Sequence, residues 1–424
     1  MWRPSAALSP IMLLMASFLD SVPLSGIIRI RDMMYAVDRP FRLDQGDVSF
    51  DAPETVKAAL ARGIIENRSH YVQTTGIPAL VALIAEKLRT KNGIPIGADD
   101  EVMVTTGGVH GLFTVCQGLF EPGDEVLLPD PRWPPAGGNI AAARAVPVPY
   151  PLHASRGWRP DVDEIRSLIT PRTRGIYVNT PHNPTGGVLT RADLEAIAAL
   201  AREHDLWVLS DEAYEDVLYD GHTHVSLASL PGMYERTIPL YTMSKTYAIT
   251  GLRLGYIAVH NPTIRDRVRK LLFFTVSNTS SLIQYGGIGA LAGSQEVVAG
   301  FRTELEARRT LFYRGIADVA GGVLSGAPPP GAFYAFLKID PAWQSPLGGA
   351  HASQSWAMSE YLIKEGRIGC VPGVDFGQQG EGYVRFCFAR DRSELSGALE
   401  QMRALFSNPA HDVQGRRDRD VPAG

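Results

Sequence analysis

The sequence has few of the features expected of an extracellular, membrane or nucleic-acid-binding protein. Only three of its 424 residues are cysteines. Cys116, Cys370 and Cys387 are too few and too widely spaced for a disulfide framework or a cysteine-based zinc site, which favours a reducing, cytoplasmic setting. The 41 basic and 45 acidic residues leave a net charge of -4, so the chain lacks the basic surface that binds a polyanion. We expect no nucleic-acid partner.

The chain also has no long hydrophobic run. Its most apolar stretch near the start, Ile11 to Leu19, is far shorter than the ~20 residues that a membrane span needs, and no small-residue cleavage site follows it before Asp20. We therefore expect residues 1–24 to form an N-terminal arm and no membrane contact. Residues 407–424 show no apolar periodicity, which predicts a disordered tail.

Short apolar runs alternate with helical patterns through most of the chain, which predicts βαβ units and an α/β fold with a mostly parallel sheet. Thr190 and Asp193 have the spacing of a capped helix start, and Leu194, Ile197 and Ala201 follow on one face. A second helix is expected directly after residues 107 and 108. The strand candidates are residues 102–104, 125–128, 175–178, 206–209, 238–241 and 256–259.

The pattern changes after about residue 295 and ends in a helix that carries Leu395, Leu399 and Met402 on one face. This change predicts a second, smaller domain. The expected division is residues 25–50 as the N-terminal part of the small domain, residues 51–295 as the large domain and residues 296–406 as the rest of the small domain.

Polar and glycine residues follow the predicted strands where each one ends. In open α/β sheets the loops at the carboxyl ends of the strands meet in one crevice, where helix N-termini also point. That crevice would collect a glycine-rich helix start, an aromatic residue, an amide, a carboxylate with a phenol, and a lysine. These groups suit a flat, phosphorylated heterocycle that carries an aldehyde. The residues in question are Gly107, Gly108, Trp133, Asn183, Asp211, Tyr214 and Lys245.

Five motifs in order resemble the class I/II aminotransferases, which are pyridoxal-phosphate enzymes of the aspartate aminotransferase fold. The resemblance runs from about Ser25 to Phe406. It implies a large α/β domain that binds pyridoxal 5'-phosphate and has a mostly parallel sheet sandwiched by helices, plus a smaller α+β domain. The motifs are YVQTTGIPAL (Tyr71 to Leu80), EPGDEVLLPDPRW (Glu121 to Trp133), NPTG (Asn183 to Gly186), DEAY (Asp211 to Tyr214) and SKTYAITGLRLGY (Ser244 to Tyr256).

The resemblance assigns the catalytic roles to three residues. Lys245 matches the lysine that forms the aldimine with the cofactor and then moves the Cα proton of the substrate. Asp211 matches the carboxylate that keeps the pyridine nitrogen protonated, so that the ring accepts electrons. Tyr214, together with Asn183, matches the pair that hydrogen-bonds the phenolic oxygen of the cofactor. The implied reaction moves an amino group from an L-amino acid to a 2-oxo acid by a ping-pong mechanism.

The resemblance also implies how the rest of the cofactor is held. Trp133 matches the aromatic residue that stacks on the ring. Tyr71 resembles a residue that reaches the phosphate in the neighbouring subunit, which implies a homodimer with shared active sites. The expected phosphate ligands within the chain are Gly107, Gly108, Val109, Thr242, Ser244 and Arg253.

Three residues are expected to bind the substrate. Arg385 resembles the small-domain arginine that grips the α-carboxylate through two hydrogen bonds, and Gly46 resembles the glycine whose backbone approaches the same group. Asn183 is assigned to the substrate as well as to the cofactor. In the bacterial aspartate aminotransferases that the chain resembles, a lysine that meets the distal carboxylate of the substrate often follows the two glycines. Here Val109 and His110 stand in that place, which predicts a broad or less acidic donor, with 2-oxoglutarate or pyruvate as acceptor.

The motifs leave two other functions open. A β-lyase, a cyclopropane-forming synthase or an amino-acid oxidase would use the same Lys245, Asp211 and Arg385, because all of these reactions begin at the Cα proton. A non-catalytic relative would bind a ligand on the same scaffold. No metal site is expected: His222 and His224 have no third ligand at a suitable spacing, which predicts a solvated loop there.

Overall fold

The computed structural model of the chain describes residue 22 and residues 25–320, 322–348 and 353–407. The expected N-terminal arm and C-terminal tail lie outside the described residues, apart from residues 22 and 407. Within the described ranges, no helix has both the length and the apolar character that crossing a lipid bilayer requires.

The large sheet has eight strands in the order β1-β8-β7-β6-β5-β2-β3-β4. The six predicted strands are all present, and β3 and β4 were not predicted. The fold class is confirmed as α/β with a mostly parallel sheet. The strands are β1 (Val102–Thr105), β2 (Glu125–Asp130), β3 (Val146–His153), β4 (Arg159–Pro160), β5 (Thr173–Asn179), β6 (Trp207–Asp211), β7 (Thr237–Thr242) and β8 (Gly255–Ala258).

The strand directions bring most carboxyl ends to one edge of this sheet. Strands β3, β2, β5, β6 and β7 are parallel to one another, while β8 runs antiparallel to both β7 and β1. The first residue of β8, Gly255, therefore pairs with the last residues of its neighbours, Thr105 and Thr242. The loop that precedes β8 consequently reaches the same edge as the loops that follow the other strands.

Both faces of the large sheet are covered by helices, which explains why its central strands are apolar without alternation. Adjacent residues of one strand belong to different cores: Leu128 packs with α4, α5 and α9, whereas Leu127 packs with α7. The helices of this lobe are α2 (Glu54–Ile65), α3 (Pro78–Thr90), α4 (Gly107–Leu119), α5 (Pro134–Ala142), α6 (Val162–Ser167), α7 (Arg191–Glu203), α8 (Met243–Thr246), α9 (Pro262–Val276) and α10 (Ser281–Ala292).

Two of the predicted helix starts are confirmed. The Thr190 side chain accepts from the backbone N-H of Asp193, and the Asp193 carboxylate accepts from that of Thr190, so α7 begins with a complete capping box. Helix α4 begins at Gly107, directly after β1. Its first backbone N-H groups therefore lie at the edge of the sheet where the strands end.

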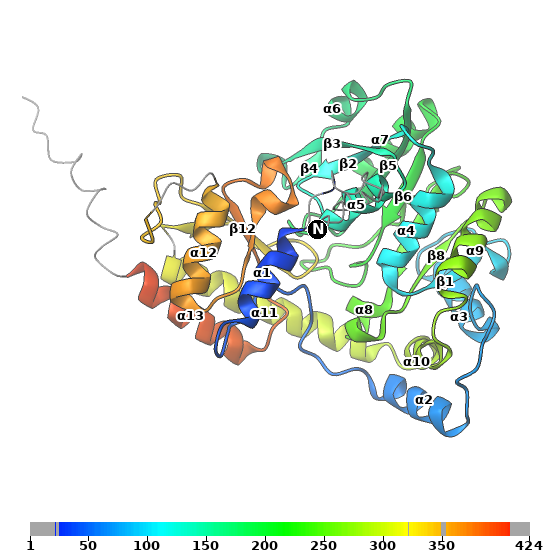
Figure 1. Ribbon diagram of the computed structural model, residues 1–424, viewed down its shortest axis with the longest axis horizontal. Helices are drawn as coiled ribbons and strands as arrows, with labels where there is room; N and C mark the ends of the chain where they lie inside the picture. The colour runs from blue at the N-terminus through cyan, green and yellow to red at the C-terminus, as the bar shows by residue number, and fades with distance from the viewer. Residues whose placement is uncertain (1–21, 23–24, 321, 349–352, 408–424) are drawn as a thin grey trace, which may run out of the picture.

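The second lobe, on the left of Figure 1, holds a four-stranded antiparallel sheet in the order β11-β12-β10-β9. Segment 41–49 joins it: Phe41 forms a bridge with Ile368, and the Leu43 carbonyl accepts from the Cys387 N-H. The exact domain boundaries given above stay predictions. The elements are α1 (Gly26–Tyr35), α11 (Glu296–Ala320), β9 (Leu324–Ser325), β10 (Tyr334–Ile339), α12 (Gln354–Gly366), β11 (Val371–Pro372), β12 (Tyr383–Cys387) and α13 (Arg392–Phe406).

Candidate active site

A cavity of about 240 Å³ lies where the two lobes meet, and its lining comes from both. Lys245 reaches it from α8, directly after β7, and Arg385 reaches it from β12 of the small sheet. Most of the residues singled out from the sequence line this one cavity: Gly46, Gly108, Val109, Trp133, Asn183, Asp211, Tyr214, Thr242, Ser244, Lys245, Arg253 and Arg385.

Two of the predicted residues do not line the cavity. Gly107 lies just behind it, and a Cβ atom placed there would come within 2.5 Å of Nη2 of Arg253. Tyr71 is 89% exposed. Among the described residues, none covers the Tyr71 ring, and its expected role in a neighbouring subunit stays a prediction.

Lys245 is held in a setting that favours its neutral amine. Its ammonium donates to the Gly46 carbonyl oxygen. Burial lowers the pKa of Lys245 to about 8, and the nearby Arg253 and Arg385 act in the same direction against the raising effect of Asp47. A neutral amine is the form that attacks an aldehyde.

Asp211 ends β6 with its carboxylate facing the cavity. The Tyr177 hydroxyl and the Ala213 backbone N-H donate to this carboxylate. Burial raises the pKa of Asp211 to about 6, despite the lowering effect of the Tyr177 hydrogen bond. A carboxylate in this setting gains from pairing with a cation inside the cavity, such as a protonated ring nitrogen.

The start of α4 and the loop before β8 together form a cradle for an anion. The Arg253 guanidinium lies against Gly107, and its Nη1 is 3.4 Å from Oγ of Ser244. The Thr242 hydroxyl donates to Ser244 over 2.9 Å. A helix N-terminus, a guanidinium and two hydroxyls in one corner form a donor set that fits a phosphate dianion.

Arg385 is prepared for a carboxylate. It is 2% exposed, its Nη1 donates to Oδ1 of Asn183 over 3.1 Å, and its Nη2 donates to the Asp44 carbonyl over 2.7 Å. Its Nε is buried and has no hydrogen-bond partner among the described residues. Because an unmade hydrogen bond from a buried charged group is costly, this arginine fits an anionic substrate group that enters the cavity.

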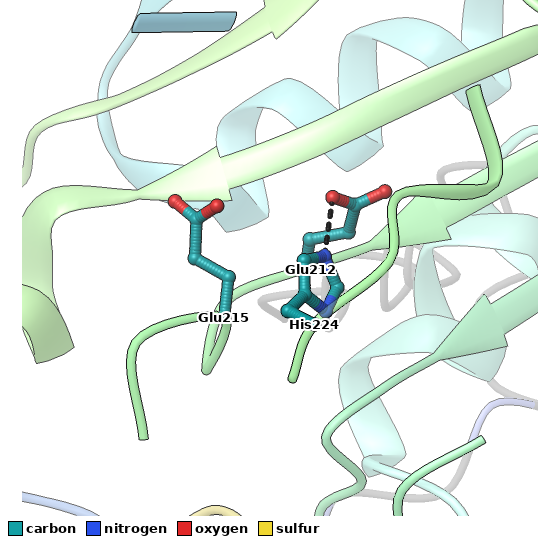
Figure 2. Close-up of side chains that lie close together, drawn as sticks. All are labelled: Glu212, Glu215 and His224. Atoms are coloured by element: carbon teal, nitrogen blue, oxygen red, sulfur yellow. Dashed lines mark hydrogen bonds and ion pairs between the residues drawn. The ribbon is translucent and has the colours of Figure 1, made fainter. Parts of the chain in front are cut away.

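A histidine and two carboxylates that are not among the cavity-lining residues lie close together, as Figure 2 shows. One ligand atom each of Glu212, Glu215 and His224 lies within 4.8 Å of the others. The expectation of a solvated loop at His224 is wrong: its side chain is 9% exposed, and its Nε2 lies 2.8 Å from Glu212. His222 is exposed, as expected.

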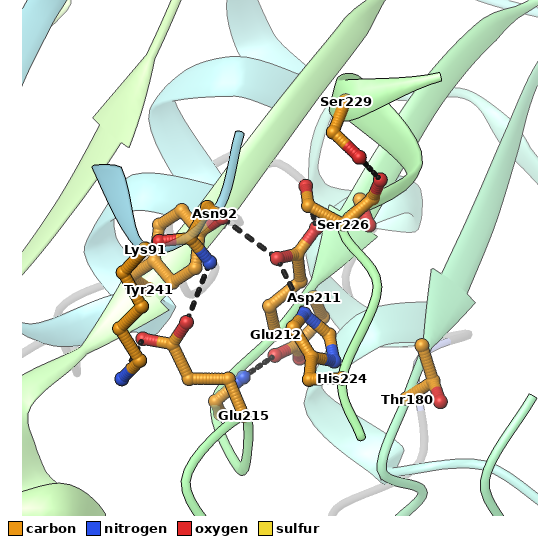
Figure 3. A network of polar contacts seen from close by, with 12 residues as sticks. Lys91, Asn92, Thr180, Asp211, Glu212, Glu215, His224, Ser226, Ser229 and Tyr241 are labelled. Atoms are coloured by element: carbon orange, nitrogen blue, oxygen red, sulfur yellow. Dashed lines mark hydrogen bonds and ion pairs between the residues drawn. The ribbon is translucent and has the colours of Figure 1, made fainter. Parts of the chain in front are cut away.

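The carboxylates of this cluster already have partners, several of which are visible in Figure 3. Glu212 accepts from the hydroxyls of Ser210, Ser226 and Tyr241 as well as contacting His224. Glu215 pairs with Lys87 and accepts from Asn92 over 2.7 Å. Burial would lower the pKa of His224, but the two glutamates outweigh it and raise that pKa. We interpret the cluster as a buried network that fixes the segment following Asp211.

Some residues of the cavity have no role assigned to them from the sequence. Ile27 lines the cavity from α1, and Asn179 and Tyr334 line it from the ends of β5 and β10. The residue after Val109 does not line it: His110 accepts from the Thr106 N-H over 3.2 Å and contacts the Thr275 hydroxyl over 2.9 Å. Burial also lowers the pKa of His110, so this ring supplies no positive charge to the cavity at neutral pH.

Comparison with known proteins agrees with this geometry. The family Aminotransferase class I and II matches residues 39–402. An aromatic-amino-acid aminotransferase of Thermococcus litoralis is 36% identical over 91% of this chain and 96% of its own length. An aspartate aminotransferase of Pyrococcus abyssi is 34% identical over 92% and 97%. The solved aspartate aminotransferase of Rhizobium meliloti superposes with a TM-score of 0.86 at 31% identity, over 92% of this chain and 98% of its own.

The chain belongs to the class I and II aminotransferases. It is a pyridoxal-phosphate-dependent enzyme that transfers an amino group between an amino acid and a 2-oxo acid. Among the reactions that the motifs left open, transamination is therefore the one that this protein performs.

Proposed function

We propose that this aminotransferase takes L-amino acids whose side chains carry no distal carboxylate, with pyruvate, which also lacks a second carboxylate, as acceptor. The cations among the described cavity residues are Lys245, Arg253 and Arg385. Lys245 is needed for the amine chemistry, Arg253 for the phosphate and Arg385 for the α-carboxylate. No cation among these residues is then left for a second carboxylate. This absence of a further cation carries the proposal. Ile27 and Val109 add apolar surface to the same cavity.

The cofactor, when bound, supplies an aldehyde that accepts the amino group and a ring that takes up the electrons left by the Cα proton. The residues of the chain hold and move the protons. In the proposed arrangement the Lys245 amine takes the proton from the substrate Cα and returns it on the other side of the reaction. Asp211 keeps its negative charge beside the ring nitrogen and so holds a proton on that atom.

We further assign the orientation of the reactants to four residues. Arg385 binds the α-carboxylate, and its bond to Asn183 fixes the Asn183 oxygen, which leaves the amide NH₂ free to donate to the phenolic oxygen of the cofactor. Tyr214 donates to the same oxygen. Trp133, which lines the cavity, would stack on the ring of the bound cofactor. Because Arg385 and Lys245 belong to different lobes, a bound substrate favours their approach and excludes water from the cavity.

We propose a cytoplasmic homodimer whose two sites share residues. All three cysteines are free and buried, in keeping with a reducing compartment. Ile64, Ile65 and Phe274 are 64%, 78% and 78% exposed, an amount of open apolar surface that favours a protein partner. The end of α9 adjoins the phosphate cradle through the contact between Thr275 and His110. A second copy covering Phe274 would therefore border the active site.

The donor proposal is tested by adding each of the twenty amino acids to the purified holoenzyme and following the visible absorbance of the cofactor. Amino donors convert the cofactor to its amino form, which changes the absorbance, and 2-oxo acids then reverse this change. We expect aromatic and aliphatic amino acids to react faster than aspartate. A much faster reaction of aspartate with 2-oxoglutarate would contradict the proposal.

The shared-site proposal is tested by mixing two inactive variants, Lys245→Ala and Tyr71→Ala, under conditions that allow subunit exchange. If Tyr71 acts in the neighbouring subunit, each mixed dimer has one site with both native residues, and activity returns. If Tyr71 acts within its own chain, no mixed dimer has an intact site and the activity stays low. Light scattering gives the oligomeric state of each sample.

A further inference from the structure

Two buried phenols meet at the wall of the cavity. Tyr214 is 5% exposed and Tyr334 is 1% exposed, and their hydroxyl oxygens lie 2.7 Å apart, within hydrogen-bond distance. Their rings are 5.7 Å apart at 79°. Tyr214 comes from the loop after β6 in the large lobe, whereas Tyr334 opens β10 in the small lobe. This hydrogen bond therefore connects the two lobes inside the site.

Tyr334 also contacts the residue that we assign to the substrate carboxylate. The Arg385 guanidinium lies over the Tyr334 ring, 4.5 Å from its centre. Strand β10, which carries Tyr334, pairs with β12, which carries Arg385, so backbone hydrogen bonds fix this arrangement. A cation over a phenol ring withdraws negative charge from the hydroxyl and makes it a stronger hydrogen-bond donor.

The position of the Tyr334 hydroxyl is also constrained from the side of Gly46. A Cβ atom at Gly46 would come within 2.4 Å of that hydroxyl. Glycine is therefore needed at this position for the phenol to reach Tyr214. The Gly46 carbonyl in turn accepts from the Lys245 ammonium, so the same short segment contacts both the phenol pair and the reactive amine.

Each phenol has one proton to donate, and the direction of the bond between them follows from the proposed function. Tyr214 donates to the phenolic oxygen of the cofactor in that proposal, so it must accept from Tyr334. A hydroxyl that accepts a hydrogen bond becomes a better donor in turn.

We propose that Tyr334 is a positioning residue that holds the Tyr214 hydroxyl toward the cofactor and strengthens it as a donor, which links Arg385 to the phenolic oxygen. This inference rests on the role of Tyr214 in the proposed function. Through this chain of contacts, Tyr334 favours the deprotonated phenolic oxygen.

The test is a pH titration of the visible absorbance of the substrate-free holoenzyme. Tyr334→Phe removes only the hydroxyl, and we expect the transition to move upward by about 0.5 to 1 pH unit, the equivalent of one ordinary hydrogen bond. Tyr219→Phe is the matched control. Its hydroxyl is also buried and donates to the Ala332 carbonyl, two residues before Tyr334. This control removes a hydrogen bond from the same segment and should leave the transition unchanged.

The double variant Tyr214→Phe/Tyr334→Phe separates the proposed route from a general disturbance. If Tyr334 acts through Tyr214, the second substitution adds no further shift to that of Tyr214→Phe. Two outcomes would overturn the inference alone. In the first, Tyr334→Phe shifts the absorbance transition equally in the native protein and in Tyr214→Phe. In the second, Tyr214→Phe shifts the transition and Tyr334→Phe does not. No shift in Tyr214→Phe would overturn both the inference and the role assigned to Tyr214.

Gly46→Ala provides a second, independent variant. The added methyl group displaces the Tyr334 hydroxyl without removing it, so the titration should move in the same direction as in Tyr334→Phe. An unchanged transition in a Gly46→Ala holoenzyme that binds the cofactor normally would contradict the inference.

Discussion

Arg385 and Asn183 are hydrogen-bonded over 3.1 Å although they lie 202 positions apart and belong to different lobes. The bond fixes the asparagine oxygen and the guanidinium, whose Nε is buried and has no hydrogen-bond partner among the described residues. A substrate carboxylate that meets this guanidinium therefore binds at the junction of the lobes. Substrate binding and cofactor orientation depend on the same pair of side chains.

Arg385→Lys tests this arrangement. A lysine keeps the positive charge but not the planar fork that binds a carboxylate through two hydrogen bonds. Since one charge-assisted hydrogen bond contributes about 1.5–3 kcal/mol, we expect kcat/KM for amino donors to fall roughly 10- to 150-fold. The cofactor absorbance should persist. Arg390→Lys, which changes an arginine paired with Glu394, is the control and should keep near-native kcat/KM. Equal losses in both variants would argue against a substrate contact by Arg385.

The raised pKa of Asp211 predicts that the apoprotein binds the cofactor less tightly in acid. Below a pH of about 6 this carboxyl takes up a proton in the cofactor-free chain, and a neutral carboxyl does not pair with the ring cation. Cofactor affinity should therefore fall as the pH drops through 6. Fluorescence titration of the apoprotein between pH 5 and pH 8 measures this. Asp211→Asn should bind weakly at every pH in that range, and a slope that persists in Asp211→Asn would rule out Asp211 as its source.

The lowered pKa of Lys245 predicts a rate of cofactor capture that also rises with pH, but with a higher midpoint than the affinity that depends on Asp211. Burial and the neighbouring arginines bring this pKa to about 8, so the neutral amine increases as the pH rises through that value. The rate at which the apoprotein captures the cofactor covalently should rise with a midpoint near pH 8. Stopped-flow absorbance gives this rate. A midpoint above 10, the ordinary range of a lysine, would show that the amine is not influenced by its surroundings.

The sequence was sufficient to predict most of the parallel sheet, because its strands are short apolar runs that end in turn or polar residues. It did not reveal β3, whose residues Pro147, Pro149 and Pro151 cannot donate to a ladder and so argue against a strand. Here β3 lies beside the short final strand β4, near the edge of the sheet. Tertiary pairing with β2 outweighs the poor intrinsic preference.

The site was predictable where residues follow parallel strands and less so elsewhere. Arg253 precedes its strand and reaches the site only because β8 runs antiparallel to β7. It was found by its resemblance to a family motif and not by the rule about strand ends. Tyr334 and Ile27 belong to the small lobe, where no strand pattern was assigned. The burial of His224 cannot be predicted from its loop, because its partner Glu212 is twelve positions away and becomes its neighbour only in the fold.

The buried pair of His224 and Glu212 predicts a stability effect that exposed residues do not share. His224→Ala leaves the Glu212 carboxylate buried without its cation, which costs about 3 kcal/mol. For a chain of this length that lowers Tm by about 3 °C. His222→Ala, at an exposed position of the same loop, should leave Tm within 1 °C, the error of the comparison. Scanning calorimetry of both holoenzymes near pH 6 measures the difference.

The pH dependence of that effect has a definite sign. The pKa of His224 is raised in the folded chain, because the two glutamates outweigh the effect of its burial. Its contribution to stability is therefore fully present below about pH 6.5, the ordinary pKa of a histidine, and is lost as the pH rises through the folded value. The Tm difference between the native protein and His224→Ala should shrink in alkaline solution. A difference that stays constant up to pH 10 would contradict the charged pair.

The two glycines that open α4 predict different responses to the same substitution. Gly107 has a φ of +78°, and a methyl group there would come within 2.5 Å of Nη2 of Arg253. At Gly108 the methyl group would meet Cβ of Thr242 at an ordinary 3.5 Å. Gly107→Ala therefore combines a strained backbone with displacement of the guanidinium in the phosphate cradle, whereas Gly108→Ala adds a favourable helix residue.

We expect Gly107→Ala to weaken the binding of pyridoxal phosphate at least about tenfold, which corresponds to roughly 1.4 kcal/mol, and Gly108→Ala to change it less than about threefold. Equilibrium titration of the apoproteins provides both values. Titration with pyridoxal, which lacks the phosphate, distinguishes the cause. If the cradle binds phosphate, Gly107→Ala weakens the binding of pyridoxal much less than that of pyridoxal phosphate. Pyridoxal has no phosphate group, so the displacement of Arg253 costs it no contact. Equal losses for the two ligands would mean that the substitution disturbs the whole cavity and that Arg253 has no specific part in holding the phosphate.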